Sequence, residues 1–247
     1  MIDRMTSASR RLWRQWKAEL PGKVLARPSY TFCAEHCGRV HETGLVADQP
    51  RLVDFSTVPV TADQLRMEEA LKALDWQGSS VLHVGVGDSG FARRFAPQLR
   101  RVVGLTISDA ELALARSLQI PNYDVLKVSK YSWSFRPGID EPFDFILDNN
   151  PNSFACCKFH FHQMLETYCA VLKPGGMLLT DQGGMDWVAS DLRWRLQFRD
   201  LQWLERFFPL RATRLSRSVY ALVRNGTASA VLVGAQALEH AAVVQAV

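Results

Sequence analysis

The feature that most constrains the fold is an apolar run that leads directly into alternating glycines, VLHVGVGDSG at residues 81–90. The apolar residues favour a buried strand, and the glycines allow positive φ angles where that strand ends. Without a Cβ, the backbone can also approach a ligand closely, and residues 91–96 are expected to begin a helix beside it. The segment predicts a strand, a tight bend and a helix at a ligand, although a dinucleotide-binding motif or a plain tight turn gives the same local pattern.

Strand and helix patterns alternate along the rest of the chain. Four further apolar segments read as buried strands: residues 101–107, 123–128, 143–148 and 177–180. Helices are expected over residues 109–118 and from a cap at Asn152 or Ser153 through Val171. This alternation predicts an α/β fold with a parallel sheet between two helix layers. Ligands of such sheets bind beyond the carboxyl ends of the strands, so the polar residues that follow the strands should share one rim.

Four motifs, taken in order, resemble the class I S-adenosylmethionine-dependent methyltransferases. They are HVGVGDSG, VVGLTIS, FDFILDNN and LKPGGMLLTD, and the resemblance covers roughly residues 75–225. It implies a Rossmann-like methyltransferase fold, which is a doubly wound seven-stranded sheet, mostly parallel, with a closing antiparallel strand pair. Residues 210–215 and 219–223 are the candidates for that pair. It also implies S-adenosyl-L-methionine as the cofactor.

The resemblance assigns cofactor contacts to individual positions. The candidate cofactor-binding residues are His83, Gly85, Val86, Gly87, Ser89, Thr106, Ser129 and Asp148. The glycine bend would hold the methionine part of the cofactor. Thr106 would face the ribose, and Ser129 would approach the adenine.

Two of these residues depart from the family pattern, which usually has an acid at the positions of His83 and Thr106. A carboxylate accepts both ribose hydroxyl protons, whereas a threonine hydroxyl accepts more weakly. The segment GLTIS is nevertheless similar to the GLTLS-type sequence of cyclopropane fatty acid synthases, which work without that acid. His83 is either a strand-end histidine with a structural role or a titrating group that makes cofactor binding depend on pH.

Acceptor chemistry requires little from the protein beyond geometry, because a sulfonium methyl group is already electrophilic. The site must align the acceptor and, for a hydroxyl or ammonium group, remove a proton. The candidate catalytic residues are Asp148, Asn149, Asn150, His160 and His162. Residues two apart on a helix diverge by about 200°, so at most one of the two histidines should face the pocket. An exposed or structural histidine is the alternative for each.

Two segments bear on whether the acceptor is a nucleic acid or a small molecule. The sequence NNPNS at residues 149–153 loosely resembles the (D/N)PP(Y/F) loop of methyltransferases that act on nucleic acid bases, but it lacks the aromatic residue that stacks on a flipped base. Residues 190–217 combine arginines with aromatic side chains, which fits nucleic acid binding or an amphipathic helix covering the sheet. That helix would place Leu192, Leu196, Trp203 and Phe207 inward. We favour the helix and a small-molecule acceptor.

Length and composition bound the domain organisation. The 247 residues, 47% of them hydrophobic, fit one core with appendages. We expect an N-terminal extension at 1–70 that acts as a lid or substrate cap, a catalytic domain at 71–225 and an appendage at 226–247. The appendage is an extra strand and helix, a contact between copies in a homo-oligomer, or a frayed tail.

Compartment and metal content are predicted from what the chain lacks. The sequence has no apolar run of the roughly 18 residues that a membrane span needs and no apolar signal core, so we expect a cytoplasmic protein. Its five cysteines do not suggest a disulfide framework. Cys33, His36, Cys37 and His41 lack the second ligand pair of a usual zinc site. No metal is therefore expected.

These observations favour a methyltransferase that uses S-adenosylmethionine to methylate an oxygen or nitrogen of a small metabolite. Two alternatives stay open. One is an RNA or protein methyltransferase, suggested by the arginine and tryptophan segments. The other is a non-catalytic methyltransferase-like binding or scaffold subunit, suggested by the missing acids at His83 and Thr106.

Overall fold

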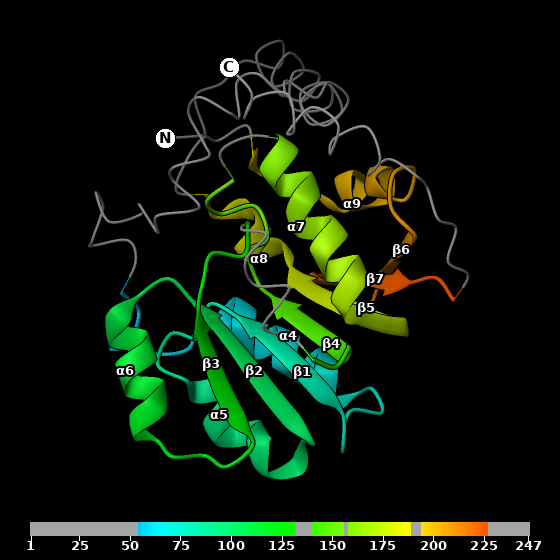
Figure 1. The fold of residues 1–247 in the computed structure, drawn as a ribbon. Helices are drawn as coiled ribbons and strands as arrows, with labels where there is room; N and C mark the ends of the chain where they lie inside the picture. Colours follow the sequence, from blue (N-terminus) through cyan, green and yellow to red (C-terminus); the bar gives the residue numbers. More distant parts are fainter. Residues whose placement is uncertain (1–53, 132–139, 156–157, 189–193, 227–247) are drawn as a thin grey trace, which may run out of the picture.

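A seven-stranded sheet organises the computed structural model, which describes residues 54–131, 140–155, 158–188 and 194–226 (Figure 1). The strand order across the sheet is β3-β2-β1-β4-β5-β7-β6. The strands are β1 (Ser80–Val84), β2 (Arg101–Thr106), β3 (Tyr123–Lys127), β4 (Phe143–Asp148), β5 (Leu172–Asp181), β6 (Leu210–Arg214) and β7 (Val219–Arg224). The first five strands are parallel, and β7 runs antiparallel to both β5 and β6. The predicted fold class is confirmed.

The order of the strands places the topological switch point beside β1. Strand β1 pairs with β2 on one side and with β4 on the other, and Val84 lies opposite both Leu105 and Asp148. These three strands therefore end at the same level. A crevice at such a point is where α/β sheets bind their ligands.

Helices cover both faces of the sheet (Figure 1). They are α4 (Ala62–Lys72), α5 (Gly90–Phe95), the 3-10 helix η3 (Ala96–Gln98), α6 (Asp109–Ser117), α7 (Lys158–Val171), α8 (Gln182–Asp186) and α9 (Phe198–Leu204). Helices α7 and α9 pack on the face that carries Leu82 and Ile146. Helices α4, α5 and α6 contribute to the core on the opposite face, which carries Val81 and Leu147. Because both faces are buried, the strands read as nearly continuous apolar runs.

Helix α7 begins later than the sequence indicates. The predicted caps were Asn152 and Ser153, but the helix starts at Lys158. The Asn152 side-chain amide donates to the carbonyl oxygens of Met185 and Trp194, at 2.8 and 2.6 Å. Its side chain thus joins the segments after β4 and β5 and does not cap a helix. The predicted end at Val171 is confirmed.

The arginine-rich region is less helical than predicted. Between residues 194 and 217 the structure has one α-helix, the short α9, and Leu196 is buried as expected. Phe207 is 45% exposed, contrary to the prediction, because it follows the end of α9 and no longer obeys helical spacing. Leu192 lies outside the described residues.

The remaining predictions on the ends of the chain concern segments that the structure does not describe. Residues 1–53, with Cys33, His36, Cys37 and His41, and residues 227–247 belong to these segments. Within the described ranges, none of the helices has the length and apolar character that crossing a membrane requires. The same ranges contain no cluster of metal-ligating side chains.

Candidate active site

The glycine bend that follows β1 adopts the predicted left-handed backbone. Gly85 has φ +77° and Gly87 has φ +52°. The Gly85 N–H donates to the Leu105 carbonyl at 2.9 Å, which fixes the bend to the end of β2. A Cβ built on Gly85 would meet no atom within 4 Å. The bend therefore borders open space in which a ligand could contact its backbone.

Val86 and Ser89 turn their side chains away from that space. Val86 is buried, and a Cβ on Gly104 would lie only 2.4 Å from Val86 Cγ1. Ser89 Oγ lies 3.1 Å from the Tyr123 hydroxyl, and burial raises the pKa of Tyr123 to about 12. Since both side chains are engaged in the core, their backbone groups are the parts that remain for a cofactor.

Glu111 supplies a carboxylate next to Thr106. The Thr106 hydroxyl donates to Glu111 Oε2 at 2.6 Å, and the Phe55 N–H donates to Oε1 at 2.9 Å. Glu111 lies in the first turn of α6 and is buried. Burial raises the pKa of this carboxyl, while hydrogen bonds from Thr106, Phe55 and Gly87 oppose that rise. The acid that the strand end lacks thus comes from the next helix.

Glu111 was missed as a site residue in the sequence, where an acid in the first turn of a helix has an ordinary explanation in the helix dipole. The available signal was its spacing, five residues after Thr106 in GLTISDAE. The hydroxyl and the carboxylate meet because Ser108 caps α6, and its Oγ accepts from the Glu111 N–H at 3.3 Å.

His83 lies inside the sheet on the face covered by α4 and α5. It is 1% exposed, its ring is 4.9 Å from that of Phe91, and its Nε2 is 3.3 Å from Gln64 Nε2. Among the described residues, Nδ1 has no hydrogen-bond partner. Burial lowers the pKa of His83 to about 4, so its imidazole is neutral at neutral pH. This placement favours the structural reading of His83.

Ser129 follows β3 at the same rim. The neighbouring Val128 N–H donates to the Thr106 carbonyl at 2.8 Å, which extends the pairing of β2 and β3. Ser129 Oγ accepts from the Tyr131 N–H at 3.3 Å. The candidate adenine contact therefore lies beside the candidate ribose contact.

Asp148 is bound to two buried side chains. Its Oδ1 and Oδ2 accept from Lys130 Nζ at 3.0 and 3.1 Å, and Tyr168 donates to Oδ2 at 2.7 Å. Lys130 Nζ also donates to the Asn150 carbonyl at 2.7 Å. Burial lowers the pKa of Lys130, and the charge of Asp148 counteracts this effect. Asp148 thus fixes the loop after β4. Lys130 could not be predicted as its partner, because the two residues are 18 positions apart and no motif links them.

Asn149 joins that loop to α4. Its side-chain amide donates to Asp63 Oδ2 at 2.7 Å, and its carbonyl accepts from Thr180 Oγ1 at 3.0 Å. Burial alone would raise the pKa of Asp63, but hydrogen bonds from Thr61 and Asn149 hold that pKa below its ordinary value. The Asn150 side chain is half-buried and bonds to no group in the described ranges. Its amide is therefore available to an acceptor.

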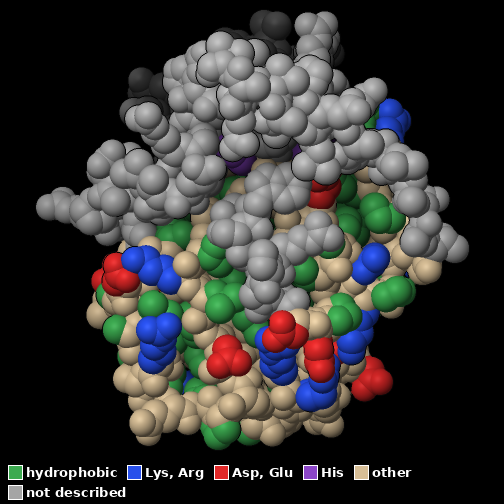
Figure 2. Space-filling view, viewed as in Figure 1, with side chains coloured by type: hydrophobic (Ala, Val, Ile, Leu, Met, Phe, Trp, Pro, Cys, Tyr) green, Lys and Arg blue, Asp and Glu red, His purple; other side chains and the backbone are tan. Residues whose placement is uncertain are grey.

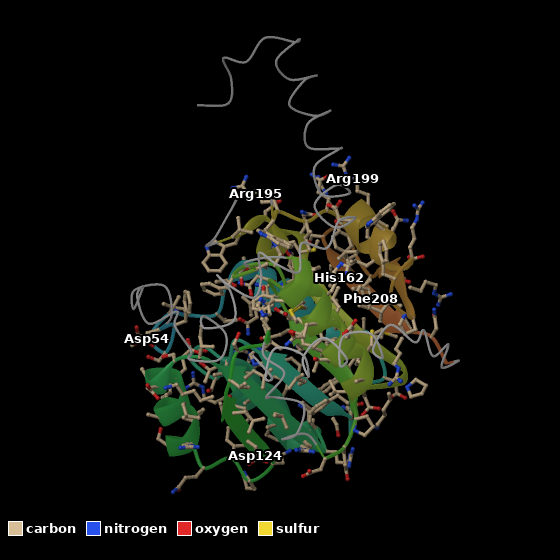
Figure 3. All side chains as sticks on the ribbon, turned by 45° about the horizontal axis from the view of Figure 1, so that its top comes forward. Asp54, Asp124, His162, Arg195, Arg199 and Phe208 are labelled. Carbon is tan, nitrogen blue, oxygen red and sulfur yellow. The ribbon has the colours of Figure 1, made fainter. Side chains whose placement is uncertain are left out.

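The two histidines of α7 lie near the start of that helix. His160 is buried. The His162 ring packs against Phe207 and Phe208, with centroids 5.9 and 5.4 Å apart, and Figure 3 shows His162 beside Phe208. This packing places His162 against the segment that follows α9.

Three aromatic side chains, Phe55, Phe154 and Trp187, form what we call the aromatic wall. The Trp187 ring meets Phe154 and Phe55 edge-on, with centroids 5.7 and 6.4 Å away. Phe55 also lies beside the glycine bend, since a Cβ on Gly87 would be 3.7 Å from the Phe55 carbonyl oxygen. The wall therefore connects the bend with the segments that follow β4 and β5.

The central part of the chain matches a known protein family. Residues 81–176, which run from β1 into β5, match the family model described as a methyltransferase domain. This match identifies residues 81–176 as a methyltransferase domain. The predicted methyltransferase domain is thus confirmed over these residues, and S-adenosylmethionine is the cofactor that such a domain implies.

Solved structures with the same fold have low sequence identity to this methyltransferase domain. A methyltransferase from Haloferax volcanii, in complex with the Trm112 methyltransferase activator, matches with a TM-score of 0.51 and 17% identity, over 64% of this chain and 88% of that one. N-methyltransferase NodS from Bradyrhizobium japonicum WM9 matches with a TM-score of 0.49 and 15% identity, over 66% and 92%. No curated protein matches in sequence. The structural likeness concerns the fold alone.

Proposed function

We propose that this methyltransferase transfers a methyl group from S-adenosylmethionine to an oxygen or nitrogen of a small molecule. The observation that carries the proposal is the open space at Gly85 together with the buried Glu111 carboxylate at the end of β2. Both lie at the switch point of the sheet, where this fold class binds ligands.

The residues present fit the cofactor. The backbone of Gly85, Val86 and Gly87 would hold its amino acid part, because the bend offers main-chain groups without an obstructing Cβ. Glu111 and Thr106 would accept from the ribose hydroxyls, and Ser129 would border the base. When bound, S-adenosylmethionine supplies an electrophilic methyl group on a sulfonium sulfur. The missing acid at Thr106 therefore no longer argues for a non-catalytic scaffold.

The acceptor side is formed by the loop after β4 and by the N-terminal part of the chain. Asn149 and Asn150 remain our candidates for contact with the acceptor, and Asp148 acts as a positioning residue because Lys130 and Tyr168 engage its carboxylate. We also propose that residues 1–70 form a substrate cap. Support comes from Phe55 beside Gly87 and from Asp63 on Asn149, since both lie at the rim.

Isothermal titration with S-adenosylhomocysteine tests the cofactor site. The wild-type chain should bind this product, and Gly85→Val should not, because a β-branched residue at φ +77° is strained and fills the open space. Gly226→Ala is the control, since a Cβ there meets nothing within 4 Å. A folded wild-type protein that binds no S-adenosylhomocysteine would refute the proposed function.

A further inference from the structure

The rim between the glycine bend and α8 combines aromatic rings with a carboxylate. The aromatic wall contributes Trp187, which is 37% exposed, and the partly buried rings of Phe55 and Phe154. A cluster of large apolar rings that includes an exposed member is a candidate contact surface, whereas a single exposed apolar residue is not. A bound molecule that covers Trp187 would explain the exposure.

Asp63 lies close to this wall through helix α8. A Cβ on Gly183, in the first turn of α8, would be 3.3 Å from Asp63 Cβ. Trp187 follows the last residue of α8, and its N–H donates to the Gly184 carbonyl at 3.1 Å. Gly183 and Trp187 are four residues apart, which is a rise of about 6 Å along a helix, so a small organic molecule can span from Asp63 to the aromatic wall.

The negative charge of Asp63 is not neutralised by a salt bridge with any described residue. Arg66, three residues along α4, forms its two hydrogen bonds with Asp181, at 3.0 and 2.6 Å, although its charge also interacts with Asp63. The donor that Asp63 does have is the neutral amide of Asn149. Glu111 likewise accepts only from neutral donors within the described ranges. The rim is therefore electrostatically suited to a cation.

We propose that the acceptor is an organic amine that binds as its ammonium ion, with its carbon skeleton against Phe55, Phe154 and Trp187 and its nitrogen toward Asp63. This inference rests on the proposed function. Aromatic faces and a carboxylate both attract an ammonium group. A neutral alcohol gains less from either, and a carboxylic acid would be repelled by Asp63.

Methyl transfer to such an acceptor begins with the loss of a proton. The ammonium group first releases one proton to water, and Asp63 then accepts a hydrogen bond from the neutral amine and keeps it in place. The nitrogen lone pair forms the new N–C bond while the electrons of the S–C bond pass to sulfur. The products are neutral S-adenosylhomocysteine, an N-methylammonium ion and the released proton.

Three probes that share one skeleton test the preference: phenethylamine, 2-phenylethanol and 3-phenylpropionate. Their binding to the full chain, saturated with S-adenosylhomocysteine, is measured by titration calorimetry. We expect the amine to bind about tenfold more tightly than the alcohol, and the carboxylate to bind most weakly. Phenethylamine should also support release of S-adenosylhomocysteine from S-adenosylmethionine.

Variants locate the preference. Asp63→Asn should bring the amine within about twofold of the alcohol, whereas Trp187→Leu should weaken both. Asp124→Asn is the matched control, because Asp124 is exposed on β3 and Figure 3 shows it far from Asp54, the neighbour of the wall residue Phe55. It should leave all three affinities unchanged.

Two results would overturn the inference: equal or absent binding of the three probes to the wild-type complex, or an amine preference that survives in Asp63→Asn. Thermal unfolding and S-adenosylhomocysteine binding are measured for every variant, and if Asp63→Asn does not fold, the probe series on wild type and Trp187→Leu decides. If the wild-type protein does not bind S-adenosylhomocysteine, the proposed function is refuted. Normal binding of that product without an amine preference would refute this inference alone.

Discussion

His83 has a neutral imidazole because its side chain, on β1, is buried under α4 and α5. Its pKa is about 4 in the folded chain and about 6.5 when the chain is unfolded. As pH falls through this window, the unfolded state takes up the proton first. The stability that depends on a neutral His83 is therefore fully present above pH 6.5 and is lost as the pH falls toward 4.

The replacement His83→Gln should remove this pH dependence. Between pH 7 and pH 5, wild type should lose about 2 kcal/mol of unfolding free energy through His83 alone, and the variant should lose that much less. Urea unfolding at the two pH values measures the difference. Parallel losses in the two proteins would show that His83 does not titrate as its burial implies.

Under the proposed function, the Glu111 carboxylate would accept a hydrogen bond from the cofactor ribose. Removing a buried charged acceptor costs about 1.5 kcal/mol or more, so Glu111→Ala should weaken S-adenosylhomocysteine binding roughly tenfold or more. Asp109→Asn is the control, because Asp109 lies in the same helical turn but is exposed and pairs with Lys127. Calorimetry compares the two. If the two variants bind S-adenosylhomocysteine with equal affinity, Glu111 does not contribute to the cofactor site.

At the scale of elements, Lys130 connects three parts of the fold. It follows β3, binds Asp148 at the end of β4, and shares that carboxylate with Tyr168 on α7. Lys130 and Asp148 are both almost fully buried. Such a pair need not add stability as a whole, but breaking it leaves a buried charge without a partner.

The substitution Lys130→Met should therefore destabilise the fold by about 3–5 kcal/mol. The double variant Lys130→Met/Asp148→Asn should recover part of this loss, because the unpaired charge is gone. Lys127→Met should cost less than about 1 kcal/mol, since its salt bridge with Asp109 is exposed. Urea unfolding of the four proteins provides the comparison. If Lys130→Met alone were as stable as the double variant, the loss of stability would not come from the unpaired charge of Asp148.

Elements differ in how far the sequence could predict them. The strands could be predicted because both sheet faces are buried, which gives β1, β2 and β4 continuous apolar runs. The start of α7 could not be predicted, because the Asn152 side chain, a candidate helix cap, instead donates to carbonyl groups more than 30 residues away in the sequence. The site shows the same division. The Gly85 bend is local in sequence, whereas Asp63 meets Asn149 across 86 residues.

At the scale of the whole molecule, the charged side chains of the described residues do not form a single basic surface on the face that Figure 2 shows. Basic and acidic side chains are interspersed there. Two arginines of the α9–β6 region also lie over aromatic rings: the Arg206 guanidinium is 4.3 Å from the ring centroid of Trp203, and that of Arg214 is 4.2 Å from the ring centroid of Phe198. These rings are covered by the protein's own cations and are less available for stacking on bases.

The charge arrangement predicts weak binding of RNA. In fluorescence polarisation with labelled poly(U) at 50 mM salt, the dissociation constant should exceed about 10 μM, and its slope against salt should be shallow, because that slope counts the phosphates that are neutralised. The acids Asp63 and Glu111 at the rim would repel a phosphate chain from the same space that suits an ammonium ion. Submicromolar binding that weakens steeply with salt would favour RNA methylation instead, and it would move the acceptor from the aromatic wall to the arginines around α9.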